Sequence, residues 1–126
     1  MRIINLFALL IVLVALSGCG SGGVKSGGAV KFEDGAPLTE GIIYFVDTQS
    51  EFSGRIKGDG SYVIGGIREG DGLPPGQYQV YVTFPAILDP KDWPIDEKFT
   101  APATSGWQAE VKPGGKNQFD FAVSRK

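Results

Sequence analysis

After residue 28, apolar and polar residues alternate along short stretches that are separated by turn-forming residues. In the clearest stretch, residues 77–84, one face is apolar and carries Tyr78, Val80, Val82 and Phe84. Alternation with a period of two is typical of a β-strand that buries one face. The same pattern predicts further strands at 29–33, 41–47, 52–57, 61–65, 107–112 and 119–123.

These stretches together predict an all-β fold, since none shows a sustained helical period. Each strand has an apolar face that another sheet must cover, so residues 28–126 are expected to form a seven-stranded antiparallel β-sandwich. Residues 41–47 are apolar on both faces. This stretch is therefore either covered on both sides or meets a partner with its outer face.

The first 18 residues carry the pattern of an export signal. Arg2 is followed by eleven consecutive apolar residues at 6–16. A membrane-spanning helix needs about 20 such residues. The pattern predicts that residues 1–18 are a signal peptide that is cleaved from the mature chain.

Cys19 is the only cysteine of the chain and directly follows this segment. The sequence LSGC at 16–19 resembles the lipobox of bacterial lipoprotein precursors, which implies that Cys19 is acylated and anchors the protein to membrane lipid of the bacterial envelope. Gly20 in the next position is compatible with the outer membrane. Residues 19–27 then form the lipidated cysteine and a flexible glycine and serine tether. The alternative is a free cysteine, a liability in an oxidising compartment.

The composition excludes several catalytic chemistries. The chain contains no histidine and one cysteine, so it lacks the residues for Ser-His-Asp hydrolysis and for zinc sites with histidine or paired cysteine ligands. A formal net charge of −2 argues against a nucleic-acid partner, which favours a basic surface. We expect neither an enzyme nor a cofactor.

Residues 85–106 interrupt the strand pattern and contain four of the eight prolines. Connections longer than about 12–15 residues without regular structure are often functional, so this segment is the first place to look for a site. An exposed Trp93 could stack on a sugar ring or anchor an envelope protein; alternatively, it packs back on the sandwich. Tyr81 lies on the polar side of its strand and is the second candidate for binding.

Acidic residues gather in the same segment and leave a calcium site open as an alternative to a solvated loop, because calcium prefers oxygen ligands. Their spacing matches no EF-hand, and neighbouring lysines partly neutralise them. The candidate ligands are Asp89, Asp92, Asp96 and Glu97.

Four motifs resemble, in the same order, those of the carboxypeptidase regulatory-like domains, which have a transthyretin-like sandwich related in architecture to immunoglobulin domains. They are GAV at 28–30 leading into DGAPL at 34–38, a glycine at 41, DGSY at 59–62 and LPPGQY at 73–78. The resemblance implies an accessory, adhesive or structural module without catalytic residues. Residues 85–106 are longer than the link usual in that family.

The combined expectation is a lipid-anchored, non-catalytic β-sandwich of the cell envelope that serves as an interaction or structural module. The alternative is a carbohydrate- or calcium-binding module that uses residues 85–106.

Overall fold

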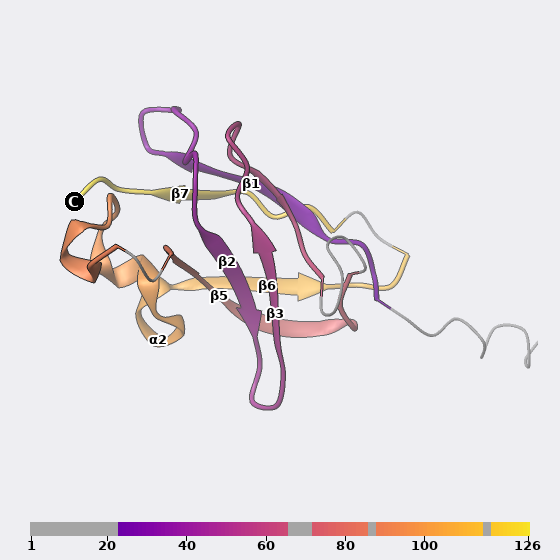
Figure 1. The fold of residues 1–126 in the computed structure, drawn as a ribbon. Helices are drawn as coiled ribbons and strands as arrows, with labels where there is room; N and C mark the ends of the chain where they lie inside the picture. Colours follow the sequence, from indigo (N-terminus) through magenta and orange to yellow (C-terminus); the bar gives the residue numbers. More distant parts are fainter. Residues whose placement is uncertain (1–22, 66–71, 86–87, 115–116) are drawn as a thin grey trace, which may run out of the picture.

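The computed structural model describes residues 23–65, 72–85, 88–114 and 117–126. In these residues two β-sheets pack against each other (Figure 1). One sheet has three strands in the order β4-β1-β7, and the other has four in the order β3-β2-β5-β6. The predicted all-β, two-sheet architecture is confirmed. The strands are β1 (Gly27–Phe32), β2 (Ile42–Val46), β3 (Glu51–Arg55), β4 (Ser61–Val63), β5 (Gly76–Thr83), β6 (Trp107–Val111) and β7 (Phe121–Val123).

The core lies between the two sheets and is built from the apolar residues that alternate along the strands. In β5 the residues Tyr78, Val80 and Val82 are buried, as their alternation predicts. Each aliphatic or aromatic side chain removed from water in this way contributes about 1.5–3 kcal/mol. The side chains that are completely buried come from both sheets and their connections: Val30, Ile43, Phe45, Ile64, Leu73, Val80, Val82 and Val123.

The three-stranded sheet differs from the prediction, because it is not antiparallel throughout. β1 and β7 run parallel, with Val30 beside Phe121 and Phe32 beside Val123. After β6 the chain joins the start of β1, where the Gly27 amide donates to the Asn117 carbonyl at 3.0 Å. Since β7 enters the sheet at the end where β1 begins, the two strands must run in the same direction.

The sandwich also begins earlier than the predicted tether allows. The backbones of Val24 and Leu73 exchange two hydrogen bonds of 2.8 and 3.2 Å, and Ser26 is buried. A Cβ atom on Gly28 would overlap the Phe119 carbonyl oxygen. Glycine in this position therefore permits a close backbone approach. Residues 24–27, which the sequence assigns to the tether, lie against the sandwich in the structure. The proposed signal peptide 1–18 and Cys19 lie outside the described residues.

The segment between β5 and β6 contains short helical turns, although no regular structure was predicted there. They are η1 (Pro90–Asp92), η2 (Glu97–Thr100) and α2 (Pro102–Ser105). Ile95 and Phe99 are buried and attach the segment to the core. No helix in the described part of the chain has the length and apolar character needed to cross a membrane.

Candidate binding surface

The outer face of the four-stranded sheet carries apolar side chains on a polar background. In β2, Ile43 and Phe45 point into the core, so that Ile42, Tyr44 and Val46 lie on the opposite side and remain half-buried. Both faces of β2 are therefore apolar, and the outer face is only partly covered. The other members of the outer face are Glu51, Ser53, Arg55, Gln77, Gln79, Tyr81, Thr83, Gln108 and Glu110.

Tyr44 and Tyr81 form the centre of this face. They lie directly opposite each other in the pairing of β2 with β5. Their ring centroids are 4.9 Å apart and the ring planes differ by 13°, so the rings are stacked. Such a pair is worth about 0.5–1.5 kcal/mol beyond the area it buries. The stack therefore holds both rings in place before any ligand arrives.

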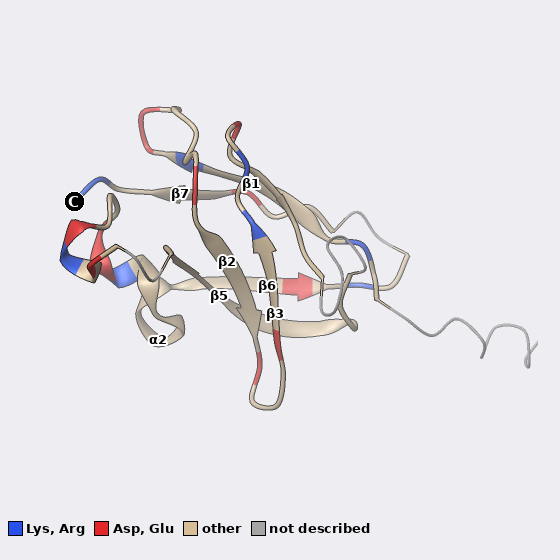
Figure 2. Ribbon diagram, in the orientation of Figure 1, with Lys and Arg blue, Asp and Glu red and all other residues tan. Residues whose placement is uncertain are grey.

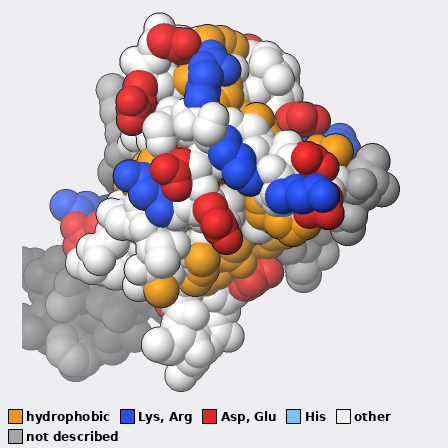
Figure 3. Space-filling model, turned by 90° about the vertical axis from the view of Figure 1, so that its left-hand side faces the viewer, with side chains coloured by type: hydrophobic (Ala, Val, Ile, Leu, Met, Phe, Trp, Pro, Cys, Tyr) orange, Lys and Arg blue, Asp and Glu red, His pale blue; other side chains and the backbone are white. Residues whose placement is uncertain are grey.

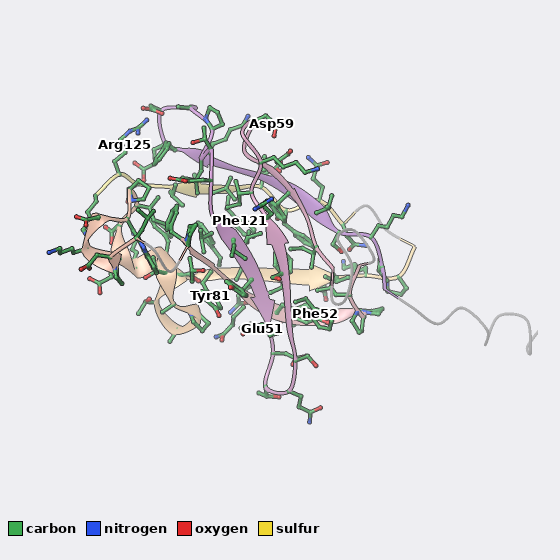
Figure 4. The ribbon with its side chains drawn as sticks, viewed as in Figure 1. Glu51, Phe52, Asp59, Tyr81, Phe121 and Arg125 are labelled. Atoms are coloured by element: carbon green, nitrogen blue, oxygen red, sulfur yellow. The ribbon has the colours of Figure 1, made fainter. Side chains whose placement is uncertain are left out.

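Glu51 acts on the polar end of Tyr81, and Figure 4 labels both residues. Partial burial of the phenol raises the pKa of Tyr81, and the negative charge of Glu51 and its hydrogen bond with the phenol raise it further. Because β2 lies between β5 and β3, the Tyr81 side chain must extend across β2 to reach Glu51. Tyr81 stays protonated at neutral pH and presents a fixed ring.

An open groove of about 620 Å³ adjoins the tyrosine pair. Val46 and Gln79 are cross-strand partners next to Tyr44 and Tyr81 on the same face, and both line the groove. Pro102 of α2 also lines it. The Ser105 hydroxyl donates to the Val80 carbonyl at 2.5 Å and thereby fixes α2 beside β5. The remaining lining residues are Asp47, Thr48, Gln77, Tyr78 and Gln108.

The groove has little charge. Among its lining residues only Asp47 carries a charged side chain, and none is lysine or arginine. One carboxylate oxygen of Asp47 accepts hydrogen bonds from the amides of Gln49 and Ser50, at 2.8 and 2.6 Å, within the β2–β3 turn. In Figure 2 the strands β2 and β5 are accordingly almost entirely tan.

Trp93 packs back on the sandwich, which was the alternative prediction for this residue. Its indole N–H donates to the Leu88 carbonyl at 3.3 Å, and its ring lies 5.5 Å from that of Phe84. The half-buried indole also lines a smaller pocket of about 200 Å³, together with Lys91, Glu97 and other residues. The indole of Trp93 is therefore held by contacts within the protein.

The candidate calcium ligands do not converge. Asp89 accepts a hydrogen bond from the Lys91 amide at 3.1 Å, and Asp96 accepts one from the Lys98 amide at 3.0 Å. Each carboxylate thus caps its own 3₁₀ turn, η1 or η2. In the residues that the structure describes, no three acidic, histidine or cysteine side chains lie close enough to hold a metal ion.

The end of the molecule that carries η1, η2 and the C-terminus is covered with charged side chains of both signs (Figure 3). Acidic and basic groups alternate there, and hydrophobic side chains are scattered between them. This end contrasts with the weakly charged groove on the outer face of the four-stranded sheet.

Tyr81 was identified from its phase in the strand, whereas Tyr44, Gln79 and Gln108 were missed. Their signal in the sequence is weak, because glutamine is ordinary on an exposed strand face. The apolar outer side of residues 41–47 was the only pointer towards Tyr44. Comparisons of the chain with protein-family models, with curated proteins and with solved structures find no match.

Proposed function

We propose that this chain is a lipid-anchored, non-catalytic β-sandwich of the bacterial cell envelope, and that it acts as an interaction module through the outer face of its four-stranded sheet. The observation that carries the proposal is the half-buried row formed by Ile42, Tyr44 and Val46, extended across the sheet by Tyr81. Apolar surface that is rimmed by polar residues is typical of interaction sites. The polar rim here includes Glu51 and Arg55.

The anchor is proposed from the LSGC sequence at 16–19 and from the position at which the described chain joins the sandwich. Only four residues separate Cys19 from Val24, which span at most about 18 Å when fully extended. An acylated Cys19 would therefore hold the end of the sandwich near Val24 and Leu73 close to the bilayer. The segment with η1 and η2 lies at the opposite end (Figure 1) and would face away from the membrane.

The two-sheet architecture and the four sequence motifs also support a place for this chain among the carboxypeptidase regulatory-like domains. In these motifs proline and glycine set backbone angles. Gly60 of DGSY, for example, has a φ of 86°, in the region that glycine adopts without strain. Such motifs specify architecture and bring no reactive group, which is consistent with a binding role.

The anchor is tested by labelling bacteria that express the full chain with radioactive or clickable palmitate. The native chain should be labelled and should sediment with membranes, whereas Cys19→Ser should lose the label and be released from the membrane. A Cys19→Ser chain that is labelled and retained as well as the native chain would contradict the anchor.

The interaction surface is tested by photo-crosslinking in the same cells, with benzoylphenylalanine in place of Tyr44. The matched control carries it in place of Val63, an exposed residue of β4 that belongs to the other sheet. We expect defined adducts from position 44 that are absent from position 63. Equal adducts from both positions, or none from position 44, would refute the proposed surface.

A further inference from the structure

We propose that the groove beside the tyrosine pair binds a neutral polysaccharide, so that the ligand of this module is an uncharged glycan. The inference rests on the interaction surface proposed above and specifies what that surface recognises. Three features of the groove carry it: its hydrogen-bonding groups, its low charge and the adjoining rings.

The polar lining of the groove consists mainly of carboxamides. Gln79 of β5 lies opposite Gln108 of β6, and Gln77 and Thr48 line the same groove. A carboxamide both donates and accepts hydrogen bonds, and so does the threonine hydroxyl. Sugar hydroxyls have the same dual character, so a pyranose can satisfy these groups without any charged partner.

The charges near the groove disfavour polyanions. A polyanion requires cationic side chains, but the lining contains no lysine or arginine and does contain Asp47. Glu110 lies opposite Gln77 in the adjoining strand, but its charge is paired with Lys112 at 3.3 Å, so Asp47 is the charge that a ligand in the groove would meet. A neutral glycan avoids the electrostatic repulsion that a polyanion would meet.

The tyrosine pair offers aromatic surface next to these carboxamides. Val46 and Gln79 form the neighbouring cross-strand pair, and strands rise about 3.3 Å per residue. The rings therefore begin roughly 7 Å along the strands from the groove lining. The electron-rich face of a tyrosine attracts the weakly positive C–H groups of a sugar ring. Because the ring stack with Tyr44 already holds Tyr81, binding costs little side-chain entropy.

A protein partner fits the groove less well than a glycan does. When a protein partner buries neighbouring carboxamides, each group that is left without a hydrogen-bond partner weakens binding by about 1–3 kcal/mol. Each sugar of a neutral polysaccharide carries several free hydroxyls, which both donate and accept hydrogen bonds and can therefore satisfy the carboxamides more readily. The groove volume of about 620 Å³ lies in the range of small-ligand sites.

The test uses the full chain, extracted from bacterial membranes in a detergent without a sugar headgroup, such as lauryldimethylamine oxide. Native gels are cast with hydroxyethyl cellulose, laminarin, galactomannan or dextran as neutral polysaccharides, and with alginate as the anionic one. At least one neutral polysaccharide should retard the chain, and alginate should not. Raising the salt concentration should leave the retardation unchanged, because no ion pair is involved.

Variants then locate the binding site. Gln79→Ala and Tyr81→Ala should each weaken binding by about tenfold, the effect expected for one lost hydrogen bond or stacking contact. Tyr81→Phe retains the ring and should bind more tightly than Tyr81→Ala. The matched control is Gln118→Ala, which removes an exposed glutamine that precedes β7 of the other sheet. It should bind like the native chain, and thermal unfolding verifies that all variants are folded.

Three results would overturn the inference: retardation by none of the neutral polysaccharides, retardation by alginate alone, or equal retardation of all variants. A fourth contrary result would come from analytical sedimentation. If the native chain self-associates and Tyr81→Ala abolishes this self-association, the groove binds a second copy of the chain instead of a glycan. If the crosslinker at position 44 captures a protein while no glycan binds, the interaction surface stands and only the glycan inference fails.

Discussion

The variant Tyr62→Phe removes one buried hydroxyl. It tests how much the hydrogen bond that joins the two edges of the three-stranded sheet contributes to the stability of the fold. Tyr62 in β4 is 2% exposed, and its hydroxyl donates to the Phe119 carbonyl at 2.5 Å. Phe119 lies just before β7, and β1 separates β4 from β7. Burial raises the pKa of Tyr62 strongly, and the charge of Asp120 adds to the increase. The hydroxyl therefore remains a donor throughout the pH range in which the protein is handled.

The structure sets the magnitude of the effect. Phenylalanine keeps the ring, so the substitution creates no large cavity. It removes a hydrogen bond worth about 0.5–1.5 kcal/mol and leaves the Phe119 carbonyl without this partner, for a total of about 1–2 kcal/mol. In a domain of this size, that loss lowers Tm by roughly 4–12 °C.

Urea unfolding, followed by the fluorescence of Trp93 and Trp107, measures this loss. Tyr78→Phe is the matched control, because the Tyr78 hydroxyl donates to the Pro74 carbonyl at 2.6 Å and Pro74 is exposed. Water can replace the lost donor there, so we expect a smaller loss than for Tyr62→Phe. A loss below about 0.5 kcal/mol for Tyr62→Phe, typical of surface changes, or equal losses in both variants, would refute the reasoning.

Two further predictions concern the backbone and acid stability. Gly28→Ala should cost about 1–3 kcal/mol in the same urea assay, because its Cβ would overlap the Phe119 backbone. Gly58→Ala should not lower the stability by this amount, because the added Cβ meets nothing within 4 Å. Equal stability of the two variants would contradict the close approach of Gly28 to the Phe119 backbone. The hydrogen bond from the Ala36 amide, and then that from Arg125, lower the pKa of Asp34 from 3.8. Its contribution to stability is therefore complete above about pH 4 and is lost as the pH falls through the lowered value. Carboxyl NMR titration should show the Asp34 pKa rising in Arg125→Ala while that of Asp59 does not change; an unchanged Asp34 pKa would exclude the contact with Arg125.

The strand positions could be predicted because alternation is a local property of the chain. Residues 77–84 illustrate this, since the predicted inner face of Tyr78, Val80, Val82 and Phe84 is buried in the structure. β2 and β6 also fall within a residue of their predicted limits. Two sheets follow from this pattern because each apolar face must be covered.

The predictions failed where contacts between distant segments decide the outcome. The parallel pairing of β1 with β7 depends on the end of the sandwich at which the chain returns, which no pattern within either strand encodes. The pattern assigns Gly27 to the tether, although a Cβ atom there would overlap the Tyr62 carbonyl oxygen of the neighbouring strand. Short turns such as η1 and η2 have no period to detect, because each extends over a single turn.

The candidate site could likewise be predicted from the sequence only in part. Tyr81 could be selected from its phase alone, and the apolar outer side of residues 41–47 indicated either a covered strand or a surface for a partner. The stack of Tyr81 on Tyr44 and its contact with Glu51 could not be predicted from the sequence, because they depend on the register and order of β3, β2 and β5. Trp93 attracted attention as an isolated aromatic residue, yet the Leu88 carbonyl and Phe84 hold it against the framework.

By itself, the sequence determined where strands form and which of their faces are apolar, because these properties depend on neighbours one or two residues away. It also determined which catalytic residue types the chain lacks. Only the tertiary structure decided that Tyr44, Tyr81 and the glutamines of β5 and β6 share one face beside a groove. The reason is that hydrogen-bonded pairing brings together residues from separate strands, and their alignment is set by the whole sandwich.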